Sequence, residues 1–153
     1  NLLSEDESGS IRVRRDNWIL TPHPGEAGRL LGCETAEIQR DRFAAVAQLQ
    51  DKFGGVCLLK GAGSLICFQT STGRQTELCS EGNAGMASGG MGDVLSGLTG
   101  GLVAQGFALH EALQVAVCVH GESADLAADA LGQRGLLATD LYPFISQLLN
   151  PRQ

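Results

Sequence analysis

The apolar positions in the first half of the chain fall into short continuous runs of the kind that form strands. Residues 18–20 and Val56–Leu59 are apolar throughout, which predicts buried strands. An apolar residue at every position favours a strand that is covered on both faces, as in a parallel sheet between helices. Residues 64–68 and 75–79 predict two further strands, joined by a turn at 71–73.

Most of the remaining chain has the spacing of helices. The prolines at 22 and 24 favour extended backbone before them, so a helix is expected to begin at Pro24 and to end at Gly32. Thr35 is expected to cap one long helix, which the pair of glycines at 54 and 55 closes. The polar residues 4–16 predict a surface loop. Further helices are predicted at 94–105, at 109–131 and, from a cap at Thr139 or Asp140, up to Leu149.

Strands that alternate with helices predict an α/β fold with a mixed sheet flanked by helices. The 153 residues are enough for one domain, and 43% apolar and 18% charged residues are typical of a globular protein. No apolar run reaches the roughly 20 residues that a membrane-spanning helix needs. The formal net charge of −6 argues against nucleic-acid partners, which select basic surfaces. We therefore expect neither nucleic-acid nor membrane partners.

The five cysteines are widely spaced, and no two of them form a C-x-x-C pair. They predict buried free thiols in a reducing, cytoplasmic environment.

Glycine is most concentrated between Glu81 and Gly106, around a single acidic residue, Asp93. Because glycine weakens helices and strands by roughly 0.5–1 kcal/mol relative to alanine, this excess requires a compensating role. Glycines let backbone amides approach an anion, and a following helix presents the positive end of its dipole there. Asp93 is then either an acid that stabilises the first helical turn or a base beside a phosphate-binding loop, and the glycine density favours the base. Gly97 and Gly101 are expected to let a neighbouring element come close.

A second segment with glycines, Lys60-Gly61-Ala62-Gly63-Ser64, follows the predicted strand Val56–Leu59. Ligands of open α/β sheets bind beyond the carboxyl ends of strands, so Lys60 is placed to meet a phosphate. The alternative is a hairpin turn with a solvated lysine.

His23 and Glu26 also follow a predicted strand, at the start of a predicted helix. His23 is either a packed side chain or a catalytic one, and zinc is not expected here because no second His or Cys lies at ligand spacing. Glu26 is either an ordinary acid of the first turn or a residue that holds Mg²⁺ through water. His110 and His120 are expected to be structural.

Four segments, taken in order, resemble the ADP/ATP-dependent NAD(P)HX dehydratases of the ribokinase-like superfamily. They are TPHPGEAGRLLG at 21–32, LLKGAGSLI at 58–66, NAGMASGGMGDVLSGLTGGLVAQG at 83–106 and RGLLATDL at 134–141. The resemblance implies a ribokinase-like layered fold and a lyase of metabolite repair. Such an enzyme uses ADP or ATP to phosphorylate the hydroxyl of a hydrated nicotinamide cofactor, NADHX or NADPHX. With ADP it yields AMP and phosphate as NAD(P)H is restored.

The resemblance also implies roles for individual residues. Asp93 is implied as the catalytic base and, with His23, as a contact of the hydrated cofactor. Glu26 is implied beside Mg²⁺, through water, although kinases of the superfamily carry Asn where His23 stands. The residues implied at the adenine nucleotide are Lys60, Gly61, Ala62, Gly63, Ser64 and Gly92, and the amides implied in an anion hole are those of Gly90, Met91 and Gly92.

Residues 1–153 are expected to be the C-terminal half of such a domain, completed by an N-terminal half or a companion chain, and a homo-oligomer is expected. Two other functions stay open. One is a ribokinase-like small-molecule kinase, although the residues before Asp93 fit the dehydratases better. The other is a nucleotide-binding module without catalysis, which would bind ADP but show no turnover.

Overall fold

The structure of the chain, a computed structural model, describes residues 14–150, which form two units. The first unit ends at Leu78 and the second begins at Cys79, and each is described by itself. Most of the loop predicted at 4–16 lies outside the described residues.

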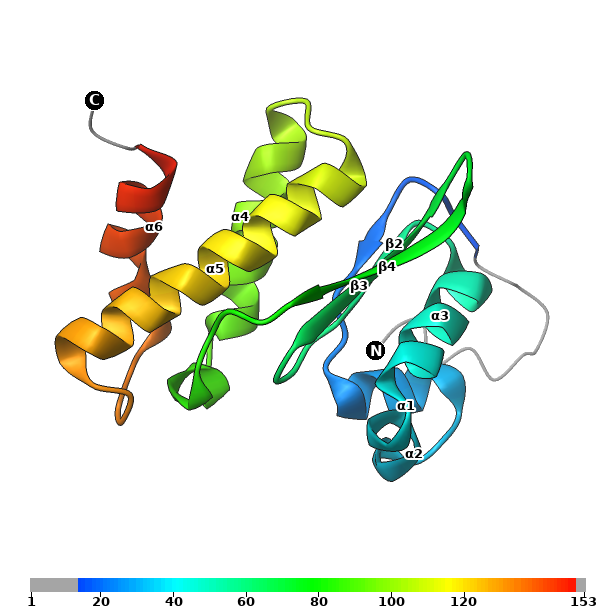
Figure 1. The fold of residues 1–153 in the computed structure, drawn as a ribbon, viewed down its shortest axis with the longest axis horizontal. Coiled ribbons are helices and arrows are strands. Elements are labelled where there is room, and N and C mark those ends of the chain that lie inside the picture. The colour runs from blue at the N-terminus through cyan, green and yellow to red at the C-terminus, as the bar shows by residue number, and fades with distance from the viewer. Residues whose placement is uncertain (1–13, 151–153) are drawn as a thin grey trace. The chain divides into compact units, whose positions relative to one another are not determined.

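The first unit is a mixed sheet with helices packed against it (Figure 1). Its strands lie in the order β1-β2-β3-β4. β1 pairs with β2 in parallel, whereas β2 pairs with β3 antiparallel, which confirms the predicted mixed sheet. The strands are β1 (Ile19–Leu20), β2 (Val56–Leu59), β3 (Ser64–Thr70) and β4 (Gly73–Cys79).

The helices of this unit are α1 (Pro24–Leu31), α2 (Thr35–Arg40) and α3 (Arg42–Phe53). The prediction of one long helix is wrong, because the helix is interrupted at Asp41. The Asp41 carboxylate accepts the N–H of Ala44 at 2.9 Å and so caps a new helix. The predicted cap at Thr35 is also wrong, since Glu34 occupies the cap position and Thr35 is the first helical residue.

One face of the sheet builds the core of the first unit. Side chains two apart on a strand share a face, which places Cys57 with Leu59 and Leu65 with Cys67. These four residues form one buried cluster with apolar residues of α1, α2 and α3. All of β2 is buried, as the unbroken apolar run predicted.

The second unit consists of helices that pack on a central long one, α5 (Figure 1). α5 (Leu109–Leu131) has the predicted bounds and packs against α4 (Met91–Ala104) and α6 (Tyr142–Leu149). Two short 3₁₀ helices, η1 (Ala84–Ala87) and η2 (Ala138–Leu141), precede α4 and α6.

The predicted cap of the last helix is wrong, because Thr139 and Asp140 lie within η2. The Asp140 carboxylate accepts the N–H of Leu137 at 2.8 Å, so it stabilises the 3₁₀ turn, and α6 begins only at Tyr142.

The segment that connects β4 to η1 is held against α5. The Asp125 carboxylate on α5 accepts the Gly82 N–H and the Asn83 side-chain N–H, both at 2.8 Å. A Cβ atom at Gly121 would lie 2.7 Å from Cβ of Glu81 and 2.8 Å from its carbonyl carbon and oxygen. Only glycine at 121 therefore allows this segment to approach α5 so closely.

All five cysteines are free thiols. Cys57, Cys67 and Cys79 are buried, as predicted, but Cys33 is only partly buried and Cys118 is exposed. The expectation of burial is thus wrong for Cys118, which lies on an outward position of α5. Within residues 14–150, no helix combines the length and the apolar character needed to cross a membrane.

We expect replacement of Gly121 by alanine to lower the free energy of unfolding by about 1–3 kcal/mol, because the new methyl group overlaps the Glu81 backbone. Denaturant unfolding measures this change. The control is Gly100→Ala on α4, where a Cβ atom meets nothing within 4 Å. That variant should be as stable as the wild type or up to about 1 kcal/mol more stable. A Gly121→Ala variant with wild-type stability would contradict the close approach.

Candidate active site

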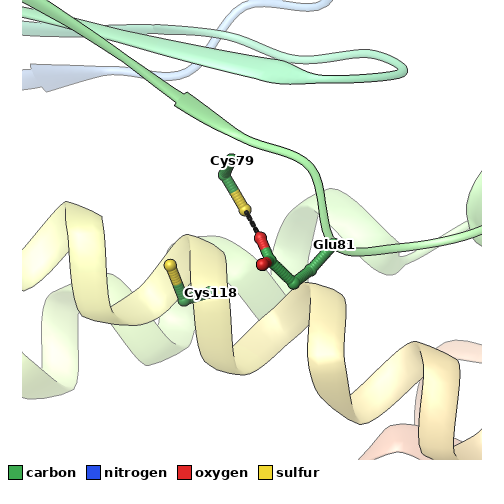
Figure 2. A group of neighbouring side chains, drawn as sticks. All are labelled: Cys79, Glu81 and Cys118. Carbon is green, nitrogen blue, oxygen red and sulfur yellow. Dashed lines mark hydrogen bonds between the residues drawn. The ribbon is translucent and has the colours of Figure 1, made fainter.

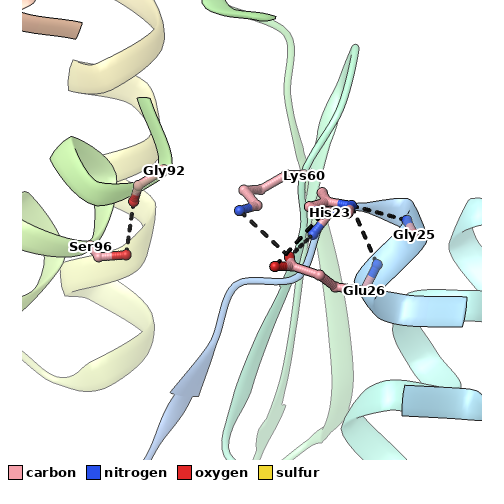
Figure 3. Close-up of polar contacts among 6 residues, drawn as sticks. All are labelled: His23, Gly25, Glu26, Lys60, Gly92 and Ser96. Atoms are coloured by element: carbon pink, nitrogen blue, oxygen red, sulfur yellow. Dashed lines mark hydrogen bonds and ion pairs between the residues drawn. The ribbon is translucent and has the colours of Figure 1, made fainter. Parts of the chain in front are cut away.

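The parallel pairing of β1 with β2 brings two predicted site segments together in the first unit. The carboxyl ends of parallel strands lie at the same edge of a sheet, so the residues after β1 and β2 are neighbours there. The Lys60 N–H donates to the Pro22 carbonyl at 2.9 Å. The Lys60 Nζ lies 3.8 Å from Oε2 of Glu26, as Figure 3 shows. Two of the predicted motifs therefore share one cluster.

His23 is the N-cap of α1 (Figure 3). Its Nδ1 accepts the N–H groups of Gly25 at 3.0 Å and of Glu26 at 3.3 Å. In return, Oε2 of Glu26 accepts the His23 N–H at 2.8 Å. This is the reciprocal arrangement that Ser or Thr with Glu usually makes at a helix start. Because Nδ1 acts as an acceptor, the hydrogen-bond pattern assigns the ring proton to Nε2, which lies 3.7 Å from Oε1 of Glu26.

Glu26 is held in its ionised form. Burial by itself would raise the pKa of Glu26, but the hydrogen bond from the His23 backbone and the positive charge of Lys60 outweigh burial and lower it. An ionised carboxylate at a helix start fits a position beside Mg²⁺, which typically keeps several of its waters and uses one or two protein carboxylates. The geometry fits both roles predicted for Glu26, the acid of a first turn and a ligand through water.

The turn that carries Lys60 joins β2 to β3. The alternative of a hairpin turn is therefore correct for the backbone, but Lys60 is only partly exposed and faces Glu26 rather than bulk solvent alone. Gly61 and Gly63 adopt positive φ angles of 148° and 70°, so these two glycines meet a conformational requirement of the turn.

Arg42, the first residue of α3, supports this turn. Its Nη1 donates to the Ala62 carbonyl at 2.5 Å, and its Nη2 donates to the carbonyls of Leu59 at 3.3 Å and Lys60 at 3.4 Å. Nothing in the sequence marks Arg42 for this role, because no local pattern links the start of a helix to a turn this distant in the chain. Its side chain fixes the backbone at the place where a nucleotide was predicted to bind.

In the second unit, Asp93 lies in the first turn of α4. Gly90 is the N-cap, with a φ of 88° that a residue with a side chain rarely adopts, and its carbonyl accepts the N–H groups of Asp93 and Val94, both at 3.0 Å. The N–H groups of Met91 and Gly92 lie in the first turn, where the helix itself offers no carbonyl to accept them. Since Gly90 has no side chain to cap them, they lie at the helix end as donors for an external acceptor.

Asp93 also lines an open cleft of about 650 Å³. Gly97 lies one turn further along the same face of α4, and a Cβ atom there would meet nothing within 4 Å. The expectation that Gly97 and Gly101 permit a close neighbour is therefore wrong within residues 14–150, because the space beside both is open. The absence of a side chain at Gly97 instead keeps the cleft wide. The other residues that line the cleft are Gly89, Gly90, Val94, Leu98, Leu137, Ala138, Thr139, Tyr142 and Ile145.

The predicted site residues thus form two groups, each assembled within its own unit. The first contains His23, Glu26, Lys60, Gly61, Ala62, Gly63 and Ser64, and the second contains Gly90, Met91, Gly92 and Asp93.

Comparison with known proteins identifies the family to which these features belong. A family profile described as NAD(P)H-hydrate dehydratase matches residues 1–147. The chain belongs to the NAD(P)H-hydrate dehydratase family.

Two curated relatives of the family cover nearly the whole chain. The bifunctional NAD(P)H-hydrate repair enzyme Nnr of Coxiella burnetii is 53% identical over 151 residues, which cover 99% of this chain and 29% of that protein. The ADP-dependent (S)-NAD(P)H-hydrate dehydratase of Neisseria meningitidis is 41% identical over 152 residues, which cover 98% of this chain and 50% of that protein.

Solved structures of similar proteins confirm the ribokinase-like α/β fold. The ADP/ATP-dependent NAD(P)H-hydrate dehydratase of Bacillus subtilis, co-crystallised with ATP and Mg²⁺, matches with a TM-score of 0.78 and 33% identity, over 86% of this chain and 46% of that one. A ribokinase-like superfamily protein of Enterococcus faecalis matches with a TM-score of 0.70 and 28% identity, over 88% of this chain and 44% of that one. The chain therefore spans half or less of the length of these relatives.

Replacement of His23 by alanine should lower the free energy of unfolding by about 0.5–2 kcal/mol, because two N–H groups at the start of α1 lose their acceptor. His23→Asn should remain close to the wild type, since asparagine is a strong N-cap. Denaturant unfolding of the three proteins provides the measurement. If the alanine variant is as stable as the asparagine variant, His23 does not act as a cap.

Proposed function

We propose that this chain carries out the phosphoryl-transfer and proton-transfer steps of an NAD(P)H-hydrate dehydratase. The observation that carries the proposal is the position of Asp93. It follows directly after helix N-terminal amides that have no side-chain cap, and it faces an open cleft. A proton acceptor beside an anion-binding helix start is the pairing that phosphorylation of a hydroxyl requires.

In the proposed reaction, Asp93 accepts the proton of the hydroxyl on the hydrated nicotinamide ring. The hydroxyl oxygen forms a bond to the terminal phosphorus of ADP or ATP, and the bond from that phosphorus to the bridging oxygen breaks. AMP or ADP leaves with the electron pair. The C–O bond of the new phosphate ester then breaks, phosphate departs, and loss of a ring proton restores the double bond of NAD(P)H. A general base of this kind typically contributes about 10²–10⁴ in rate.

The amides at Gly90, Met91 and Gly92 serve as the anion hole in this proposal. Their N–H groups lie where negative charge develops on the transferring phosphoryl group, and the dipole of α4 has its positive end there. A single donor of this type typically contributes about 10²–10³ in rate.

The cluster in the first unit would bind the adenine nucleotide. Lys60 supplies a positive charge, and Arg42 positions the turn of Gly61 to Ser64 through its bonds to backbone carbonyls. Glu26 would approach Mg²⁺ through water, and that ion would neutralise phosphate charge when it is bound. His23, with its proton on Nε2, would donate a hydrogen bond to the hydrated cofactor.

We also propose that the working enzyme contains a further dehydratase segment, in the same or a companion chain, and that it is a homo-oligomer. The support for the further segment is that the chain spans half of the Neisseria ADP-dependent (S)-NAD(P)H-hydrate dehydratase. That segment would then supply further contacts to the hydrated cofactor.

The central test is to follow restored NADH by absorbance after the chain is mixed with hydrated NADH, Mg²⁺ and ADP or ATP. The assay is run on the chain alone and with the preceding half of the Neisseria dehydratase domain. Regained NADH with AMP, from ADP, and free phosphate supports the proposal. A stable phosphoester would support the alternative of a small-molecule kinase. Nucleotide binding without turnover in either arrangement would support a non-catalytic module.

Replacement of Asp93 by asparagine should leave folding and ADP binding intact and lower turnover by about 10²–10⁴, because the proton acceptor is lost. Calorimetric ADP titration and the absorbance assay measure the two effects separately. The control is Gly100→Ala on α4, where a Cβ atom meets nothing within 4 Å and which does not line the cleft, so it should retain turnover. Near-normal turnover of the asparagine variant would remove Asp93 from the mechanism.

Replacement of Gly97 by leucine should fill the cleft beside Asp93 and weaken binding of the hydrated cofactor at least about tenfold, which corresponds to ~1.4 kcal/mol. The same change should raise the free energy of unfolding by up to about 1 kcal/mol, since leucine favours helix over glycine. Gly100→Leu, which also meets open space but does not line the cleft, should show only the gain in stability. Equal affinity of both variants for the hydrated cofactor would show that the cofactor binds outside this cleft.

A further inference from the structure

Cys79, Glu81 and Cys118 form a cluster that has no part in the proposed reaction (Figure 2). Cys79 is the last residue of β4, Glu81 follows it by two positions, and Cys118 lies on α5. The two sulfur atoms and a carboxylate oxygen all lie within 4.8 Å of one another, and the Cys79 thiol donates to Oε2 of Glu81 at 3.0 Å. In the described part of the chain, this is the one group of three such side chains with metal-ligand spacing.

The cluster is held in place by contacts that do not involve its own ligand atoms. Gly121 lies one turn after Cys118 on α5, and a Cβ atom there would overlap Glu81, so the two segments pack closely. The Asp125 carboxylate holds the Gly82 N–H at 2.8 Å, immediately after Glu81. The segment with two of the ligands is therefore fixed against the helix that carries the third, so little ordering is needed to bind an ion.

The ligand set indicates which ion would bind. Two thiolates and one carboxylate suit Zn²⁺, whereas Mg²⁺ and Ca²⁺ require oxygen ligands. Tetrahedral zinc has bonds of about 2.3 Å to sulfur and about 2.0–2.2 Å to oxygen, which places ligand atoms roughly 3.6–3.8 Å apart. The three ligand atoms, all within 4.8 Å of one another, lie near this spacing. Because Glu81 and Cys118 are exposed, an ion there has access to water.

We propose that Cys79, Glu81 and Cys118 bind one Zn²⁺ ion, with water as the fourth ligand. The ion would join Cys79 and Glu81 to the middle of α5, within the second unit.

Zinc binding at this site would displace protons. Burial, together with the hydrogen bond to Glu81, raises the pKa of Cys79 to about 12, so its thiol carries a proton before the ion arrives. A thiol ligand must lose that proton, which passes to solvent as the sulfur–zinc bond forms. An ion that binds only the folded chain also raises the midpoint of thermal unfolding.

The test is a titration of the full chain with Co²⁺, a spectroscopic substitute for Zn²⁺, under a phosphine reductant that keeps the thiols reduced. The expected result is a thiolate-to-cobalt charge-transfer band that saturates at one equivalent and disappears when Zn²⁺ is added. Cys118→Ser and Glu81→Gln alter exposed side chains, so both variants should fold. Each should lower the affinity at least tenfold, and Cys79→Ser should do the same.

The matched control is Cys33→Ser, a thiol of the first unit, which should leave the titration unchanged. The proposal is overturned if the band does not form, or if it survives with full affinity in Cys118→Ser. It is equally overturned if Zn²⁺ binds the wild type but fails to raise the unfolding midpoint. None of these readouts depends on turnover, so their outcome is independent of the proposed enzymatic function.

Discussion

The candidate site depends on the backbone N–H groups at helix starts, which have no acceptor within their own helix. Two helix starts of the chain differ in how these N–H groups are satisfied. At α1, His23 accepts two of these N–H groups, so the helix end is closed and Glu26 is held in place. At α4, the N-cap is Gly90, which has no side chain to offer, so the donors remain for an external acceptor. A positive helix end next to a carboxylate is what makes the second start suited to phosphoryl transfer.

Each of these helix starts is positioned by a different tertiary contact. At α1, the parallel pairing of β1 with β2 brings Lys60 and Glu26 to one edge of the sheet. In the second unit, α5 anchors the segment before the glycine-rich loop through Asp125 and through the close approach at Gly121. Because a glycine-rich loop has little order of its own, such anchoring limits the conformations that lead into α4.

The fold was largely predictable because its signals are local. Unbroken apolar runs indicated β2, and proline and glycine marked the two ends of α1. The break at Asp41 was missed, since an aspartate within a helical pattern acts as a cap only when its side chain turns back to the backbone. The roles of Arg42 and Cys118 were missed for a related reason. Each role depends on a partner far away in the sequence, and the spacing of residue types does not show which distant residues come into contact.

The amino-acid sequence by itself indicated the family, through the resemblance of four segments, and most of the strands and helices. The strands and helices follow from residue types at short separations, where periodicity and backbone preference act. Only the tertiary structure decided that Arg42 supports the Lys60 turn, that Gly97 widens a cleft and that Cys79 and Glu81 meet Cys118. Such features arise from packing between elements, and packing depends on all the side chains at once.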